Sequence, residues 1–130
     1  MGYIAVLEGV ELCQAVARAL GCTPNWVIDD QPAPLYLGRM HRMASYRPDW
    51  HIEQAWRLVE RLRRGPFGLA ALTVEIRLGE GLSEHEESIT VCGPDCKPIT
   101  FDGPPDSIKT LICRAFIMVH KEAIRRRAER

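Results

Sequence analysis

The chain has 130 residues, of which 46% are hydrophobic and 26% are charged, values typical of a globular domain with a single core. Its 17 Lys and Arg residues balance 17 Asp and Glu residues, which excludes a uniformly basic nucleic-acid-binding chain and an acidic solvating one. We therefore expect one domain over residues 1–130 and no sequence-specific DNA binding.

The first residues and the most apolar segment predict a cytoplasmic protein. The first residues lack the cationic stretch that begins a signal peptide. The most apolar segment, 111–119, contains Arg114 and has about half of the roughly 20 residues that a membrane-spanning helix needs. We expect no membrane association, and we expect the five cysteines to stay reduced.

Helical spacing of apolar residues predicts a first helix over 9–20 that ends at Gly21. The following segment, 23–48, contains four prolines and three aromatic residues. Because proline fixes φ and removes a hydrogen-bond donor, we predict a loop region there, with short extended pieces at 26–28 and 35–37.

A second helix is predicted to follow Asp49, which is placed as its N-cap, and to end before Gly65. Its predicted core stripe consists of Ile52, Ala55, Trp56, Val59 and Leu62. Alternating apolar residues then predict three short strands, around 72–78, 89–91 and 99–101. Short connections, including an acidic turn region at 79–86, require these strands to form an antiparallel meander.

A long last helix is predicted after the cluster Pro104 to Ser107, with a frayed basic tail at 125–130. Its main apolar stripe consists of Ile108, Leu111, Ile112, Ala115, Phe116, Val119 and Ala123. The opposite side also carries apolar residues, namely Cys113, Ile117 and Ile124. Such a helix is either sandwiched in the core or uses its second face in an oligomer, and we expect a homodimer. The predicted fold is a small α+β domain, a three-stranded antiparallel meander packed with about three helices.

Charge is unevenly distributed along the chain and indicates a candidate ligand surface. Segment 39–64 has seven Lys and Arg against three acidic residues, whereas 79–106 has one against seven. Arginines bind phosphates and aromatic rings stack on bases, so the basic segment could hold a nucleotide-like anion. The candidate ligand-binding residues are Arg39, Arg42, Arg47, Trp50 and His51, together with Arg114, which is predicted to face solvent or a partner. The alternative is that these arginines only compensate the acidic turn.

Cys92 and Cys96 flank a tight turn and, with His85, could supply part of a zinc site. No second ligand pair completes four ligands, so we favour a simple turn and expect no metal or cofactor. The four histidines lie in different predicted elements, and no assembled nucleophile and base can be identified. We therefore expect a protein that is not an enzyme.

Three stretches carry a resemblance to a known family. They are Val16-Ala17 with Gly21, then Ile52 to Trp56 with Val59-Glu60 and Leu62, and then Leu111 to Ala115. With the order of predicted elements, they resemble the phage ABA sandwich domain family. The sequence departs from that family at Asp49-Trp50-His51, where Ser-Thr-Asp is common, and in lacking a tryptophan in the second strand.

The resemblance implies strands between helical layers and an origin in a phage or prophage. It implies no settled activity. Given this origin, our main hypothesis is a non-catalytic binding protein used in counter-defence or host interaction. Such a protein would sequester a nucleotide-type signal or block a host protein. The alternatives are a small enzyme using Cys or His chemistry, and a structural phage component.

Overall fold

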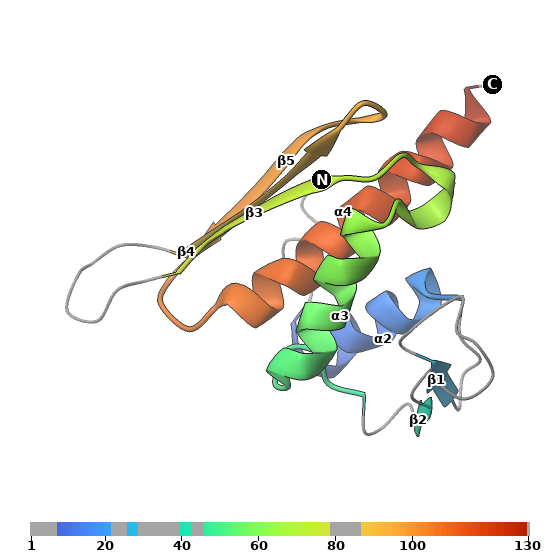
Figure 1. Cartoon of the computed structure of the whole chain (residues 1–130). Coiled ribbons are helices and arrows are strands. Elements are labelled where there is room, and N and C mark those ends of the chain that lie inside the picture. Colours follow the sequence, from blue (N-terminus) through green and yellow to red (C-terminus); the bar gives the residue numbers. More distant parts are fainter. Residues whose placement is uncertain (1–7, 22–25, 29–39, 43–45, 79–86, 130) are drawn as a thin grey trace.

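Three helices and a three-stranded antiparallel sheet make up the main body of the chain (Figure 1), as the sequence predicts. The computed structural model describes residues 8–21, 26–28, 40–42, 46–78 and 87–129. In chain order the elements are α2 (Gly9–Ala19), β1 (Trp26–Ile28), β2 (Met40–Arg42), α3 (Ile52–Arg63), the 3-10 turn η2 (Pro66–Gly68), β3 (Thr73–Arg77), β4 (Glu87–Gly93), β5 (Cys96–Gly103) and α4 (Ile108–Ala128).

The sheet is the predicted meander, with strand order β3-β4-β5 and antiparallel pairing throughout. Its two faces differ in character because side chains alternate along each strand. On β4, Ile89 and Val91 are fully buried, whereas Thr90 lies on the opposite face and its hydroxyl is 3.0 Å from that of Thr100 on β5. One face of the sheet therefore forms part of the core.

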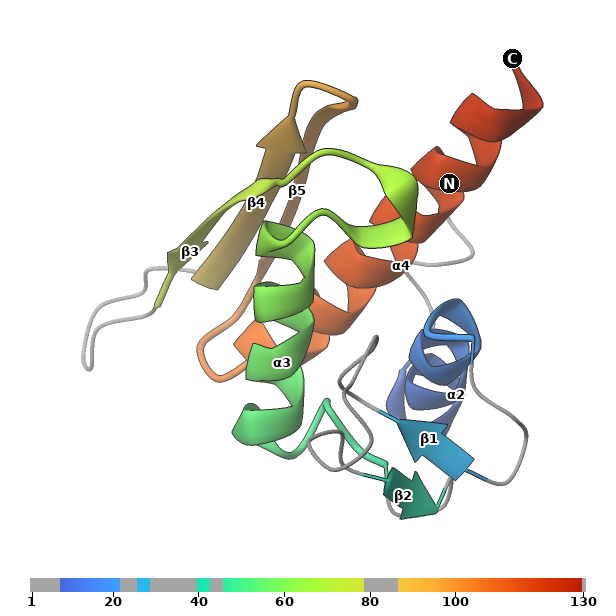
Figure 2. The ribbon, with the colours of Figure 1, turned by 45° about the vertical axis from the view of Figure 1, so that its right-hand side comes forward.

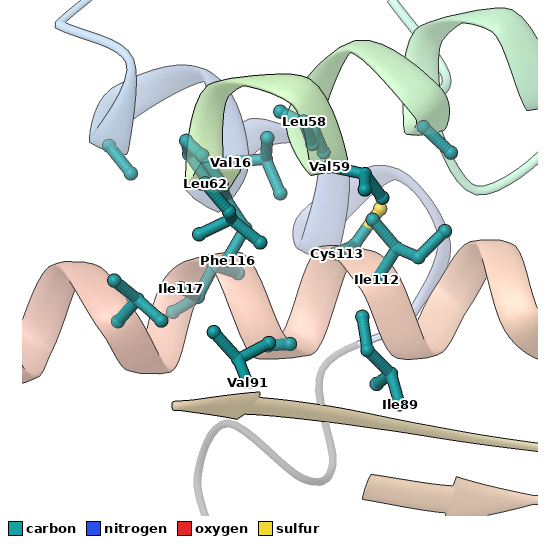
Figure 3. Close-up of a cluster of buried hydrophobic side chains, with 14 of the residues drawn as sticks. Val16, Leu58, Val59, Leu62, Ile89, Val91, Ile112, Cys113, Phe116 and Ile117 are labelled. Carbon is teal, nitrogen blue, oxygen red and sulfur yellow. The ribbon is translucent and has the colours of Figure 1, made fainter. Parts of the chain in front are cut away.

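Helix α4 lies in the middle of the molecule, between the sheet on one side and helices α2 and α3 on the other (Figures 2 and 3). This position explains why α4 is apolar on two sides. Cys113 and Ile117, from its second apolar side, are buried within the chain itself, whereas Ile124 is half exposed. The helix is therefore sandwiched within the chain. Most of the second apolar side, on which the homodimer prediction was based, is covered by the chain itself and is not available to a second copy.

The layer order differs from the one that the family resemblance implies. The implied order places strands between helical layers, but here a helix is the central layer. Thr73, Glu75 and Arg77, on the outer face of β3, are exposed. Within the described part of the chain, no helix covers that face (Figure 2). None of the described helices has the length and apolar character to cross a membrane.

Helix α3 buries three of the five predicted stripe residues, Ala55, Val59 and Leu62, but not the other two. Ile52 and Trp56 are exposed, and Leu58 is fully buried. The buried stripe consists of Ala55, Leu58, Val59 and Leu62. Trp56 lies about 110° around the helix from the centre of this stripe, by the 3.6-residue period, so it points away from α4.

The start of α3 also differs from the prediction. The helix begins at Ile52, and its N-cap residue is His51, which makes no side-chain capping bond. Asp49 is therefore not the N-cap. Its carboxylate instead accepts hydrogen bonds from Arg47 and Cys13, because the charged guanidinium of Arg47 is a stronger donor than the amides of the helix start.

Region 23–48, predicted as a loop, contains a small ladder in addition to the main sheet. Strand β1 pairs with β2, with Val27 opposite His41. The extended piece predicted at 26–28 is confirmed, and β2 was not predicted. The piece predicted at 35–37 and the acidic turn region at 79–86 lie outside the described residues.

The basic end of the chain is helical as far as the structure describes it, not frayed. Helix α4 continues to Ala128. Arg125 forms ion pairs with Glu122 and Glu129, one helical turn to either side. Arg127 donates a hydrogen bond to the carbonyl of Phe67 in the η2 turn, which ties this end of α4 to the body of the protein.

A buried carboxylate from the sheet caps the start of α4. Glu87 is buried, with 6% of its surface exposed, and its Oε1 accepts a hydrogen bond of 2.9 Å from the amide of Ile108. Ser107, at the N-cap position, makes no such bond, and its hydroxyl donates to the carbonyl of Pro104 instead. The negative charge of Glu87 faces the positive end of the helix dipole.

Replacing Glu87 by alanine is expected to lower the free energy of unfolding by about 2 kcal/mol, because it removes both the cap and the favourable charge. Ser107→Ala is the matched control and is expected to cost about 0.5 kcal/mol or less, since Ser107 gives the helix no capping bond. Urea denaturation of the two variants measures the difference. Equal losses would show that Glu87 is not the cap.

Candidate functional site

A short turn before α3 holds a buried ion pair. The guanidinium of Arg47 binds the carboxylate of Asp49 with two hydrogen bonds of 2.9 Å, from Nε to Oδ1 and from Nη2 to Oδ2. The thiol of Cys13, on α2, donates a third bond of 2.9 Å to the same Oδ1. The side chains of Arg47 and Asp49 are only 13% and 6% exposed. The Arg47–Asp49 bonds hold the turn together, and the Cys13 bond attaches it to helix α2, 36 positions earlier in the chain.

These contacts set the protonation states of the groups. Burial raises the pKa of Asp49, but the hydrogen bonds from Arg47 and Cys13 outweigh it, so the pKa is lowered overall and the carboxylate is ionised. Burial and the hydrogen bond to Asp49 raise the pKa of Cys13 to about 11. Burial also raises the pKa of Cys113 well above its ordinary value. Both thiols are therefore protonated near neutral pH and are poor nucleophiles.

Arg47 also supports an exposed tryptophan. Its guanidinium carbon lies 3.5 Å from the centre of a Trp50 ring, a stacked cation–π contact. The backbone holds this arrangement, because the amides of Trp50 and His51 both donate to the carbonyl of Arg47. The amide of Arg47 donates in turn to Oε1 of Gln54 at 2.8 Å. Trp50 is thus presented to solvent on a rigid base.

Ile52 and Trp56 are exposed apolar residues on the first two turns of α3, and the exposed Trp50 precedes this helix by two residues. Trp50 is 65% exposed, Ile52 51% and Trp56 43%. Ile52 and Trp56 are four residues apart and therefore neighbours on the same side of the helix. We call these three residues the tryptophan surface. Arg63, two turns further along, lies with its guanidinium carbon 5.9 Å from the centre of a Trp56 ring.

The candidate ligand-binding residues lie in different environments, and some lie outside the described side chains. Arg47, Trp50 and His51 lie together in the turn, with Arg47 largely buried and the other two exposed. Arg39 lies outside the described residues, and Arg42 lies in β2, where only its backbone is described.

Arg114 does not face open solvent as predicted. Its side chain is largely buried, and its Nη2 lies 3.7 Å from Oε1 of Glu8, just before α2. The reason is the central position of α4, which leaves little of this helix uncovered (Figure 3).

Four residues of this region were missed as site residues. The prediction assigned Ile52 and Trp56 to the core and Asp49 to the helix cap, and it gave Cys13 no role in a site. The sequence contained one signal for this arrangement. Arg47, Asp49 and Trp50 are close enough in sequence for the arginine to bind the aspartate and contact the tryptophan within a single turn. Nothing in the sequence could place Cys13 beside it.

The proposed half zinc site does not gather ligands among the described residues. Cys92 is half-buried, and Cys96 is buried, which raises its pKa. Asp95, in the same turn, accepts a hydrogen bond from the amide of Ala70 and forms an ion pair with Arg126. His85 lies outside the described residues. No group of three potential ligands occurs in the part of the chain that the structure describes.

No nucleophile and base are assembled among the described side chains. His51 is exposed in the turn, and the ring of His120 packs on that of Phe67 at 4.7 Å between centroids. No described cysteine forms a hydrogen bond with a histidine; Cys13 bonds Asp49, and Cys96 bonds a backbone carbonyl.

Comparison of the chain with family models, with curated proteins and with solved structures found no match in any of the three. The function is accordingly argued from the tryptophan surface and its support.

Proposed function

We propose that the protein is a non-catalytic binding protein that blocks a partner protein through the tryptophan surface. The observation that carries this proposal is the exposure of Trp50, Ile52 and Trp56 together at the start of α3. Water-exposed apolar side chains of this size are costly when they cluster, and such clusters mark interaction sites. Tryptophan and arginine are also the residues most enriched among those that dominate binding energy at protein interfaces.

The local charges favour a protein over a nucleotide-like anion. One edge of the Arg47 guanidinium, Nε and Nη2, is used by Asp49, and the side chain is only 13% exposed, so this arginine is poorly placed to bind a phosphate from solvent. Glu53 and Glu60 are exposed on α3, as are Arg63 and Arg64 at its end. The charge of this surface is therefore mixed, as is normal for the rim of a protein interface.

The biological setting of the proposal rests on the resemblance to the phage ABA sandwich domain family. Under this proposal the chain is encoded by a phage or prophage, acts in the host cytoplasm, and serves counter-defence or another host interaction by occluding a host protein. The central position of α4 departs from the layer order that the resemblance implies. The resemblance therefore supports only the proposed biological setting, and the tryptophan surface is proposed from the structure.

An affinity capture experiment from bacterial lysate tests the proposal. Wild-type protein is expected to retain one host protein in stoichiometric amount, and Trp50→Ala/Trp56→Ala is expected to reduce its recovery about a hundredfold, the effect of removing two dominant contacts. The matched control is Leu78→Ala, which removes an equally exposed apolar side chain at the end of β3 and is expected to change nothing.

Two outcomes would overturn the proposal. One is capture that is equal in the wild type and in the double tryptophan variant. The other is an eluate in which mass spectrometry finds a nucleotide and no stoichiometric protein, which would favour the sequestering of a nucleotide-type signal. Sedimentation of the purified chain at several concentrations would identify the third case, a second copy of this chain on the surface.

A further inference from the structure

The contacts beneath Trp50 form a continuous chain that begins on another helix. The Cys13 thiol, on α2, donates to Asp49. Asp49 accepts two hydrogen bonds from the guanidinium of Arg47, and the guanidinium carbon of Arg47 lies over a ring of Trp50. Each contact is close, with three hydrogen bonds of 2.9 Å and a ring contact of 3.5 Å. Only the last member, Trp50, is exposed to solvent.

Such a chain is costly to build for stability alone. Removing a carboxylate and a guanidinium from water carries a desolvation penalty that their attraction barely repays, and hydrophobic replacements are often as stable. Stacking an arginine on a tryptophan face also restricts the ring, because the planar guanidinium covers one side of it. An exposed side chain that is held in one orientation loses less entropy when a partner binds.

We propose that Cys13, Asp49 and Arg47 are positioning residues that fix the orientation of the Trp50 indole for its partner, so that α2 sets the geometry of the tryptophan surface. This inference rests on the proposed function for its purpose, but its physical content concerns Trp50 alone. It reassigns Arg47, which the sequence suggested as a ligand-binding residue, to the support of the residue that binds.

The motion of Trp50 can be measured without any partner. In a Trp26→Phe/Trp56→Phe background Trp50 is the single tryptophan, because the chain has three. Time-resolved fluorescence anisotropy then reports the fraction of fast local motion of its ring. In Arg47→Leu/Asp49→Leu, which removes both charges together, this fraction is expected to rise about two- to fivefold, the loss of one cation–π contact.

A second variant and a control make the result decisive if the first variant folds poorly. Arg47→Lys keeps a positive charge for Asp49 but has no planar group to stack, so it is also expected to release the ring. Arg125→Leu/Glu122→Leu removes an exposed ion pair on α4 and is expected to leave Trp50 unchanged. Cys13→Ser, which keeps a donor to Asp49, is expected to behave as the wild type, whereas Cys13→Ala is expected to be intermediate.

Unchanged anisotropy in both Arg47 variants would overturn the positioning role, even if their melting temperatures fell. This failure is separate from failure of the proposed function. If the tryptophan variants lose the captured protein but the anisotropy does not respond to Arg47, the surface binds without this support. If the anisotropy responds but no protein is captured, the support is real and the proposed function is wrong.

Discussion

Phe116→Ala is expected to lower the free energy of unfolding by about 3–5 kcal/mol, because it leaves a cavity where the layers of the molecule meet. Phe116 is fully buried on α4, and Figure 3 shows it directed towards α3 near Leu62. Its ring also contacts Phe67 in an edge-to-face arrangement with centroids 5.3 Å apart. Phe67 lies in the η2 turn at a positive φ of 55°, which is unfavourable for a phenylalanine and depends on this packing.

The control for this prediction lies on the same helix. Ile124 is half exposed, and Ile124→Ala is expected to change the free energy of unfolding by about 0.5 kcal/mol or less. Urea denaturation of both variants gives the comparison, with circular dichroism to verify that each remains folded. Similar losses at the two positions would contradict the placement of Phe116 at the centre and of Ile124 at the surface.

The sheet and the helices could be predicted because their signals are local. Alternation over 72–78 and at Ile89 and Val91 follows directly from the geometry of strands, and short connections allow only antiparallel pairing. The double-sided apolar pattern of α4 correctly indicated a sandwiched helix. The same pattern also allowed a dimer, because a sequence does not show whether the second layer belongs to the same chain.

The predicted stripe of α3 was wrong at Ile52 and Trp56, and there is a physical reason. Trp56 and Ile52 are apolar and helically spaced, and a core position was the natural assignment for both. A stripe that includes Leu58 has the same helical period but lies slightly further around the helix. The contact of α3 with α4 determines which of the two stripes is buried. The apolar residues left outside the core are those that a binding surface would use. Under the proposed function, this mismatch between pattern and burial marks the residues that would contact a partner.

The candidate site could be predicted only in part. Arg47, Trp50 and His51 were placed together because they are neighbours in sequence. The role of Arg47 was not foreseen, because it depends on Asp49 turning away from the helix and on Cys13, which is 36 residues earlier. Arg114 was assigned to the surface only because it lies away from the main apolar stripe of its helix. That inference is valid for a helix with one buried side, but α4 is covered on two sides.

Arg47→Leu alone is expected to lower the free energy of unfolding by about 3–5 kcal/mol at neutral pH, because it leaves the carboxylate of Asp49 buried without its charged partner. The pH dependence should also reverse. In the wild type the lowered pKa of Asp49 stabilises the fold above the unfolded-state pKa of about 3.9, and this contribution is lost as the pH falls through the folded-state pKa. In the variant, burial without the arginine raises the pKa of Asp49, so stability should increase on acidification from pH 7 towards pH 5.

Arg47→Leu/Asp49→Leu is expected to recover most of the loss, to within about 1 kcal/mol of the wild type, because leucines fill the buried space without a desolvated charge. The thiol of Cys13 then loses its acceptor, which costs little because a thiol is a weak donor. Urea midpoints of the wild type, both single variants and the double variant at pH 5 and pH 7 complete the cycle. If the losses in free energy of unfolding of the two single variants simply add in the double variant, Arg47 and Asp49 do not interact energetically. Recovery of stability would instead show that the fold does not require these charges, which leaves the orientation of Trp50 as the property that the ion pair maintains.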